Sequence, residues 1–438
     1  MDNKKKSLGR LAFPICIEIL FFMLAGMVDT LMLSSVSDQA VGAVGTANTY
    51  IGMFIIMFSI ISNGMMAVMT QNIGAGKPGV AYQARCLGSM FNATLSIIMG
   101  IFLAFGGGTV LRVVGIAESL YEPATSYLQI VGGCCFLNAL IPIYSGYLRA
   151  FGFMHQPLIA VITGNVLNLL LNAVFLFVFD MGVVGVALAT VISKIVNLII
   201  VMVFSAILVK AKEDPNRIPV STVLKQIIKI GLPSAFETAL YNFAMTLVIR
   251  FLNQMDAGGL HVTARSYVVQ ITNFSYCIGA ALAQANAIMT GWSVGANDYD
   301  TCNKQTKKAA LIGIAIGIVV ASIIALLGKP IVSIFTTDAE MIALVQKILI
   351  VDIFLEIGRV SNLIFGNALK TCGDALFPVI IGAIFMFLCA VGGTYFFGIH
   401  LGLLAVGAYI GLASDECVRA VAMFLRWQSG AWKNKRIV

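Results

Sequence analysis

Two carboxylates lie inside the first long apolar run of the sequence, Leu11–Leu33. They are Glu18 and Asp29, and on an α-helix this spacing places them about 20° apart around the axis and about 16 Å apart along it. Carboxylates on one face of an apolar helix can exchange a proton or Na⁺ with a substrate, or can form fixed hydrogen bonds that hold the packing. Oxygen ligands suit both ions, so the sequence leaves the coupling ion open.

Three asparagines share one face of another apolar stretch, 157–179. Asn165, Asn168 and Asn172 fall within about 60° of one another on a helix. Amide side chains at such positions either line an ion or substrate site or bond neighbouring helices together. Lys194 lies in the following apolar run, where its long side chain can reach the helix end or an internal carboxylate.

Charged residues recur at helical spacing in two later apolar runs. Asp352, Glu356 and Arg359 follow one stripe of a helix. Glu356 and Arg359 can form an ion pair there, or the stripe can take part in coupling or gating. The last apolar run repeats the pattern, and we predict a gate or a structural pair from its three charged residues, Asp415, Glu416 and Arg419.

The elements that hold these residues are expected to span a membrane. Of the 438 residues, 59% are hydrophobic and only 11% are charged, and the mean hydropathy is +0.94. A soluble domain needs more charge than this on its surface. The apolar runs have the ~20 residues that cross about 30 Å of hydrocarbon. We therefore predict an all-α integral membrane fold, with twelve transmembrane helices in two pseudo-symmetric six-helix bundles around a central cavity. The spans are expected near 11–33, 41–69, 87–111, 124–146, 157–179, 184–209, 230–254, 260–291, 309–328, 341–366, 375–397 and 402–425.

The basic residues predict the orientation of the chain. Of 28 Lys and Arg, twenty fall on the side of the N-terminus, including Lys4, Lys5 and Lys6. Only Arg112 and Lys329 lie in loops on the opposite side. Because cytoplasmic loops carry the excess of Lys and Arg, both termini are predicted to be cytoplasmic, in a multi-pass protein of the cell membrane. The positive charge thus orients the protein, and no nucleic-acid partner is predicted.

The two halves of the chain resemble each other at an offset of about 220 residues. "LAFPICIE" near the start matches "IGLPSAFE" after the midpoint, which places Pro14 over Pro233 and Glu18 over Glu237. Further along, "GYLRAFGFMHQP" matches "GNALKTCGDALFP", which places Arg149 over Lys370. Each half holds an even number of predicted spans, so the repeats are parallel, as in carriers that rock two bundles around a central site. The predicted domains are an N-terminal six-helix bundle, a cytoplasmic linker and a C-terminal six-helix bundle, at 1–209, 210–229 and 230–438.

Taken together, these motifs resemble the multidrug and toxic compound extrusion (MATE) family of bacterial membrane transporters. The resemblance rests on the Pro-x-x-x-Glu opening of each half, "MVDTLML" at 27–33, "QNIGAGKPGVAYQ" at 71–83 and "YLRAFG" at 147–152. It covers nearly the whole chain. It implies twelve helices in two bundles, a large central cavity, and export of organic compounds driven by inward flow of protons or sodium ions.

The resemblance also implies which positions couple the ion. Asp29 falls on the family's acidic position in the first helix, Asn168 and Thr190 on polar positions of the fifth and sixth, and Glu237 on the acidic position of the seventh. Asn172 stands where many members have an aspartate. The complete predicted ion-coupling set is Asp29, Glu18, Asn168, Asn172, Thr190, Glu237 and Glu356. If the ion is Na⁺, its expected ligands include Asp29 and Asn168.

The predicted function is secondary active multidrug efflux, in which protons or sodium ions are exchanged for organic, often cationic, compounds by alternating access. A lipid-linked oligosaccharide flippase is the alternative, although the spans lack the cluster of Arg or Lys that an anionic headgroup requires. A membrane-embedded transferase is a third possibility, but no Walker loop, nucleophile elbow or HExxH motif occurs, so no enzyme is predicted. We expect no cofactor beyond the coupling ion, H⁺ or Na⁺. The expected partners are small amphiphilic or cationic substrates and the lipid bilayer, and the protein is predicted to be a monomer.

Overall fold

The computed structural model describes residues 7–256 and 258–438, and every regular element in this part of the chain is helical. Lys4, Lys5 and Lys6, which support the predicted orientation, lie outside the described residues. The predicted all-α membrane fold is confirmed, because each of the twelve expected spans coincides with a helix or with a run of consecutive helical segments.

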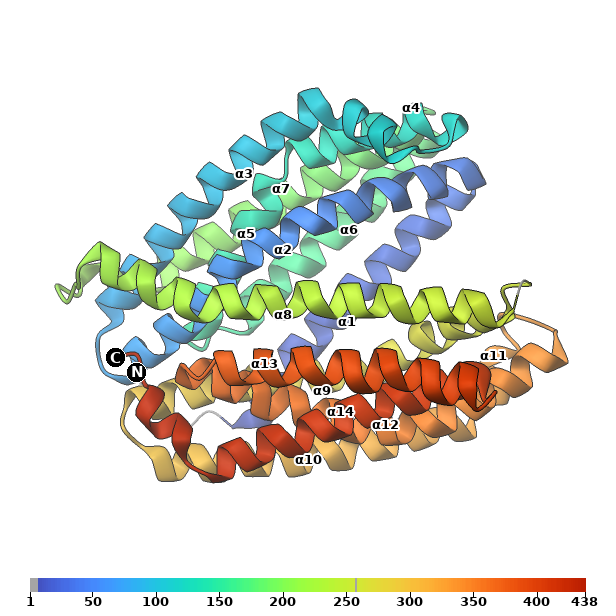
Figure 1. The fold of residues 1–438 in the computed structure, drawn as a ribbon. Helices are drawn as coiled ribbons and strands as arrows, with labels where there is room; N and C mark the ends of the chain where they lie inside the picture. Colours follow the sequence, from blue (N-terminus) through green and yellow to red (C-terminus); the bar gives the residue numbers. More distant parts are fainter. Residues whose placement is uncertain (1–6, 257) are drawn as a thin grey trace. The chain divides into compact units, whose positions relative to one another are not determined.

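The chain divides into two compact units of long helices (Figure 1). Unit 1 comprises Ile17–Leu232, and unit 2 comprises Pro233–Val438 together with the described residues up to Cys16. Both boundaries fall inside a helix, because α1 (Leu8–Ser34) and α8 (Val220–Met255) each contribute residues to both units.

The remaining helices follow the chain in order. Those of unit 1 are α2 (Asp38–Gly74), α3 (Pro78–Val114), α4 (Glu118–Tyr127), the π-helical turn η2 (Leu128–Gly132), α5 (Phe136–Ala150), α6 (His155–Phe177), α7 (Gly182–Leu208) and the 3₁₀ turn η3 (Ala211–Glu213). Those of unit 2 are α9 (Leu260–Gly295), α10 (Tyr299–Leu326), α11 (Gly328–Val332), α12 (Ala339–Cys372), α13 (Leu376–Phe385), the π-helical segments η4 (Met386–Val391) and η5 (Thr394–His400), α14 (Leu404–Gln428) and the 3₁₀ turn η6 (Ala431–Lys435).

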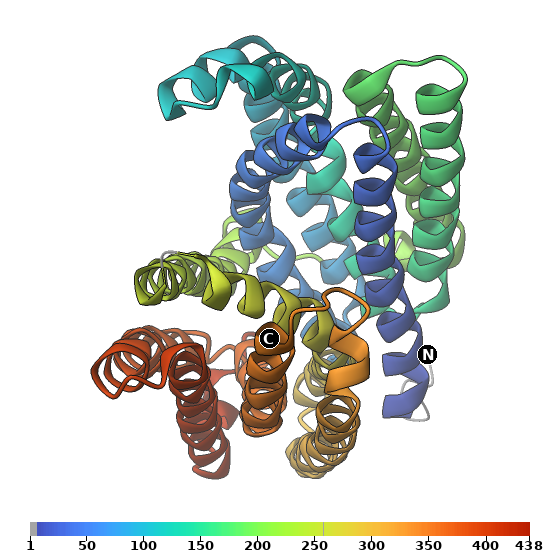
Figure 2. The same cartoon turned by 90° about the vertical axis from the view of Figure 1, so that its right-hand side faces the viewer.

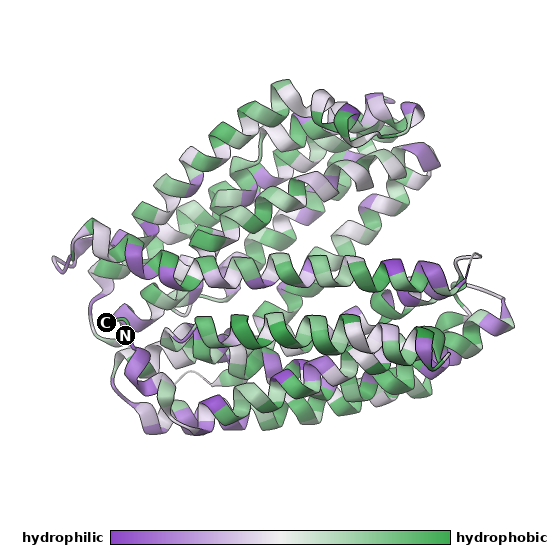
Figure 3. Ribbon diagram, viewed as in Figure 1, coloured by the Kyte–Doolittle hydropathy of each residue, from purple (hydrophilic) through white to green (hydrophobic). Residues whose placement is uncertain are grey.

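Eight of the described helices are long and apolar enough to cross a membrane, and a ninth span is counted if α4, η2 and α5 are taken as one. Three further long helices, α9, α12 and α14, are less apolar because they contain the polar and charged residues considered below. Figure 3 shows hydrophobic residues along the helices and hydrophilic ones gathered near the loops. Many large apolar side chains face outward, such as Phe105, which is 86% exposed. Such an apolar exterior suits contact with lipid.

One span of unit 1 is bent where the sequence predicts a continuous helix. The segment expected at 124–146 consists of α4, η2 and α5, and its axis turns by 42° at the break. Glycines allow this break to lie against α3: a methyl group added to Gly100 would come within 2.5 Å of the carbonyl oxygen of Gly133. The bend therefore depends on a close backbone contact that hydropathy does not reveal.

In unit 2, α12 is the central helix. It packs against α9, α10 and α14, and Figure 2 shows it between its neighbours, in orange. Its buried face includes large aliphatic residues such as Val345, Ile348 and Leu349, together with the charged residues Asp352 and Glu356. The apolar core thus surrounds a charged stripe.

The first residues of α1 and of α8 make specific contacts in the unit to which they are assigned. In unit 2, the Sγ atoms of Cys16 in α1 and Cys277 in α9 lie 4.0 Å apart. In unit 1, Gly231 of α8 meets the backbone of Ile60 in α2, and Gly64 of α2 meets the backbone of Ile227 in α8, with no room for a Cβ atom at either glycine. The start of each half's first helix therefore packs on helices of the opposite half of the sequence.

Candidate functional site

A polar cluster in unit 1 contains three of the predicted coupling residues. Asn172 Nδ2 on α6 donates a hydrogen bond to Asp29 Oδ1 on α1, at 2.7 Å, and lies 3.2 Å from Asn168 Oδ1. Asn172 is completely buried and Asn168 is 8% exposed, whereas Asp29 is half-buried. We call Asp29, Asn168 and Asn172 the Asp29 cluster. It joins a single carboxylate to two neutral amides.

The close packing of α6 and α7 positions this cluster. Gly164, Asn168 and Asn172 are spaced four residues apart, so they lie on one face of α6, and all three are buried. At Gly164 an added methyl group would lie 3.4 Å from the carbonyl oxygen of Ser193 and from Asn197 Cβ, both on α7. This face of α6 is therefore turned toward α7.

Thr190 and Lys194 lie one turn apart on α7, near the Asp29 cluster. Thr190 is buried, and its hydroxyl donates to the carbonyl oxygen of Val186 at 2.8 Å. Lys194 Nζ donates to Asn138 Oδ1 of α5 at 2.8 Å and attracts Asp29 electrostatically. The partner of the Lys194 side chain is thus an amide on a neighbouring helix of unit 1, and no carboxylate bonds to it among the described contacts.

Two ion pairs occupy matching places in the repeat. Glu18 of α1 pairs with Arg149 at the end of α5 in unit 1. Glu237 of α8 pairs with Lys370 at the end of α12 in unit 2, with Nζ 2.6 Å from Oε2. The structure therefore gives Glu18 and Glu237 each a cationic partner within its own unit. The sequence alignment contained the signal, since Arg149 and Lys370 align in "YLRAFG" and "ALKTCG".

Unit 2 contains a second charged cluster where α12 crosses α14. The crossing is close because Gly358 lies against the backbone of Glu416 and Cys417, and a Cβ atom there would come within 2.6 Å of the Cys417 nitrogen. On α14, Arg419 binds Asp415 through two hydrogen bonds of 2.8 and 3.0 Å and lies 2.9 Å from Glu416. On α12, Arg359 pairs with Glu356.

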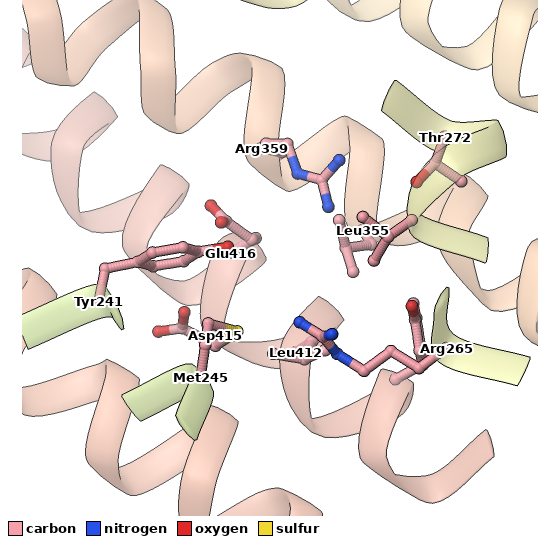
Figure 4. Close-up of a pocket in the computed structure, with 11 residues that line it drawn as sticks. Tyr241, Met245, Arg265, Thr272, Leu355, Arg359, Leu412, Asp415 and Glu416 are labelled. Atoms are coloured by element: carbon pink, nitrogen blue, oxygen red, sulfur yellow. The ribbon is translucent and has the colours of Figure 1, made fainter. Parts of the chain in front are cut away.

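The charged cluster borders a small cavity of about 60 Å³. Figure 4 shows the guanidinium groups of Arg265 and Arg359 turned toward this space, with Asp415, Glu416 and Tyr241 on its other side. Arg265 on α9 forms no hydrogen bond or ion pair with the described residues. Sequence reasoning did not select Arg265, because its distance from other charged residues along the chain hides this proximity.

Two carboxylates on α12 are buried, and each has one oxygen atom without a hydrogen-bond partner among the described residues. Asp352 is 2% exposed and Glu356 is fully buried, and neither Asp352 Oδ1 nor Glu356 Oε2 has a hydrogen-bond partner among the described residues. Burying a carboxylate oxygen without a hydrogen-bond partner is costly. Within the described residues, no three His, Cys, Asp or Glu side chains converge as metal ligands.

A model of the MatE family matches the chain twice, over residues 14–174 and 233–396. The chain belongs to the MatE family. The two matches begin at Pro14 and Pro233, the prolines that align in the internal repeat, so the family model and the repeat agree. MatE proteins are transmembrane transporters, and this chain is accordingly a transporter rather than an enzyme.

Relatives cover the chain almost from end to end. The uncharacterized transporter YisQ of Bacillus subtilis is 32% identical, over 99% of this chain and 96% of YisQ. The probable multidrug resistance protein NorM of Thermotoga maritima is 25% identical, over 99% of this chain and 94% of NorM. A multidrug resistance MATE family transporter solved in an outward-facing conformation has the same fold, with a TM-score of 0.86 at 20% identity, covering 97% of this chain and 95% of its own.

Proposed function

We propose that this MatE transporter exports small organic compounds, often cationic, in exchange for protons or sodium ions by alternating access. The names of relatives such as NorM, a probable multidrug resistance protein, support efflux of drug-like compounds over the flipping of lipid-linked oligosaccharides. The protein acts as a monomer, with both termini in the cytoplasm, and uses no cofactor besides the coupling ion.

The Asp29 cluster is the observation that carries this proposal. A carboxylate in an apolar spanning helix is costly, and such residues are found where they are paired or take part in function. The partner of Asp29 is a neutral amide, so its negative charge remains available to a proton, a sodium ion or a cationic substrate. If the ion and the substrate compete for this one carboxylate, exchange follows, because each ligand must leave before the other can bind.

Gradient-driven transport in liposomes tests this function. Asp29→Asn keeps the size and hydrogen-bonding capacity of the side chain but removes its titration. We expect this variant to lose export driven by an ion gradient while it still folds and inserts. Asp38→Asn, at the first position of α2, is the matched control and should transport like the parent protein. Uphill export by a well-folded Asp29→Asn variant at the parental rate would contradict the proposal.

A further inference from the structure

The starting observation is an arginine in unit 1 that lies among three tyrosine rings. On α3, the guanidinium carbon of Arg85 lies 4.8 Å from the ring centre of Tyr82. On α5, the ring centres of Tyr144 and Tyr147 lie 5.2 and 5.3 Å from the same atom. Because an aromatic ring attracts a cation, the three rings hold the guanidinium between the two helices.

These ring contacts leave part of the hydrogen-bonding capacity of Arg85 unused. A guanidinium carries five N–H donors and has no acceptor atom. Arg85 Nη2 donates to Cys86 Sγ at 3.2 Å, and sulfur is a weak acceptor. Arg85 Nε is buried without a hydrogen-bond partner, and no carboxylate forms an ion pair with Arg85 among the described residues. The arginine is therefore fixed in place while it still lacks an acceptor.

A second group without a partner lies beside the guanidinium. Tyr147 is only 2% exposed, and its hydroxyl forms no hydrogen bond with the described residues. A buried donor without an acceptor is costly. An anion with several oxygen atoms can accept hydrogen bonds from a guanidinium and from a neighbouring hydroxyl at the same time. The two unsatisfied groups thus match one anionic ligand.

The charged groups nearby do not supply this acceptor. The guanidinium of Arg217 lies 5.5 Å from the ring centre of Tyr82 and adds a second positive charge. The carboxylate of Asp214 is already engaged through both oxygen atoms, since one accepts from the Gly79 nitrogen and the other from Asn216. The surroundings of Arg85 therefore favour an anion that comes from outside the chain.

The level of the cluster in the membrane indicates the source of this anion. Arg85 lies two residues before the span predicted at 87–111, and Tyr147 lies one residue after the span predicted at 124–146. Phospholipid headgroups border the protein at this level. The same end of the spans carries the predicted excess of Lys and Arg, which attracts anionic lipids. Arg85, Tyr82 and Tyr144 are all partly exposed, so a headgroup can reach them.

We propose that Arg85 and Tyr147 bind the phosphate of an anionic phospholipid between α3 and α5. The guanidinium and the Tyr147 hydroxyl donate to the phosphate oxygen atoms, and the tyrosine rings keep the guanidinium in position. The bound headgroup joins α3 to α5, so the stability of unit 1 depends on the lipid. This inference requires neither a particular exported compound nor a particular coupling ion.

The experiment titrates the purified protein, in a neutral detergent, with phosphatidylglycerol and records its unfolding temperature. Phosphatidylglycerol should stabilise the parent protein at a lower concentration than phosphatidylcholine, whose headgroup has no net charge. Arg85→Gln should need about tenfold more phosphatidylglycerol, because hydrogen bonds between charged groups are lost. Arg112→Gln is the matched control and should behave like the parent, since Arg112 lies at the other end of α3, is exposed and contacts the ring of Tyr121.

A second variant separates lipid binding from packing. Tyr147→Phe keeps the ring beside Arg85 and removes only the hydroxyl. Without lipid it should be at least as stable as the parent, because a buried hydroxyl without a partner is removed, but it should bind phosphatidylglycerol more weakly. This variant also tests the inference if Arg85→Gln does not fold.

Three results would overturn the inference. Parental affinity for phosphatidylglycerol in folded Arg85→Gln or in Tyr147→Phe would leave the arginine as a packing contact between α3 and α5. An equal response of the parent protein to phosphatidylglycerol and phosphatidylcholine would show that no anionic headgroup is selected. An equal shift with inorganic phosphate alone would assign the site to a soluble anion and exclude the lipid as its specific ligand.

Discussion

At the scale of single residues, the two repeat-related ion pairs hold the first helix of each half to a later helix of the same unit. Glu18 joins α1 to α5, and Glu237 joins α8 to α12. Glu18–Arg149 and Glu237–Lys370 have side chains between 12% and 19% exposed, so water screens them only in part. Breaking such a pair leaves a partly buried carboxylate without its partner, which costs more than the pair itself contributes.

We therefore expect Arg149→Ala to destabilise the protein by about 3 kcal/mol, near the lower end of the range for a broken buried pair. The double variant Glu18→Gln/Arg149→Ala should recover part of the loss, because no charge remains unpaired. Unfolding temperatures in detergent, read by size-exclusion chromatography after heating, measure both. Equal temperatures for the single and double variants would contradict the role assigned to the pair.

The sequence predicted the acidic members of these pairs but not their partners. Glu18 and Glu237 stand out because a charge in an apolar run is rare, and the shared Pro-x-x-x-Glu motif links them. Arg149 and Lys370 lie at helix ends, where basic residues are common. Their places in the sequence therefore do not predict which carboxylates they contact. Whether Asp29 and the amides near it couple transport stays a prediction, because geometry brings them together without showing them titrate.

At the scale of helices, glycines allow close backbone contacts within each unit. Gly64 and Gly231 bring α2 and α8 into backbone contact in unit 1, and Gly358 does the same for α12 and α14 in unit 2. Small residues at a crossing allow helices in a membrane to gain van der Waals contact where no hydrophobic effect drives them together.

Gly64→Ala should lower stability by about 1–3 kcal/mol, because the added methyl group collides with the backbone at Ile227 and α8 must move away. Gly45→Ala in the same helix is the control, since a methyl group there meets no described atom within 4 Å and alanine favours the helix. In detergent, Gly64→Ala should therefore unfold at a lower temperature than Gly45→Ala. A Gly64→Ala variant as stable as Gly45→Ala would show that the crossing is loose.

The segment between α7 and α8 is fixed to α3 by a carboxylate. Asp214 accepts a hydrogen bond from the backbone nitrogen of Gly79 at 2.6 Å, in the first turn of α3, and also binds Asn216. The hydrogen bond from the Asn216 backbone, followed by that from Gly79, lowers the pKa of Asp214 below its usual value. The positive end of the α3 dipole also favours an anion there.

Because this pKa is lowered on folding, the stabilisation is complete above the unfolded value of about 4 and is lost as the pH falls through the lower folded value. Docking of the segment should thus be constant between pH 5 and 8. Asp214→Asn removes the charge at neutral pH, and amide exchange over residues 210–219 should become faster, whereas Glu213→Gln should leave it unchanged. Hydrogen exchange measured by mass spectrometry gives both rates. Equal protection in the parent and in Asp214→Asn would show that Asp214 does not fix this segment to α3.

Hydropathy predicted the helices better than their irregularities. Each expected span matches a helix or a helical run, because about 20 apolar residues crossing lipid leave the backbone no alternative to helix. The bend between α4 and α5 and the π-helical segments η4 and η5 were not predicted. They depend on contacts between helices, as at Gly100 and Gly133, which no local periodicity contains.

At the scale of the whole molecule, the distribution of Lys and Arg predicts that both termini and the linker 210–229 face the cytoplasm. In a variant without its nine native cysteines, Lys212→Cys should resist an impermeant maleimide added outside intact cells. Leu401→Cys, half-exposed in the turn before α14, should be labelled under the same conditions. Labelling of Lys212→Cys from outside would reverse the orientation.

The unit boundaries inside α1 and α8 also constrain how the protein is made. The residues of α1 up to Cys16 pack in unit 2, and Cys277 in α9 is one of their contacts. Unit 1 in turn requires Ile227 and Gly231, which belong to α8. When only the first six spans have been synthesised, the start of α1 therefore still lacks its contacts in unit 2. Unit 1 likewise still lacks the part of α8 that packs in it. Neither unit can be completed before synthesis has passed the midpoint, so assembly in the membrane must finish with both halves present.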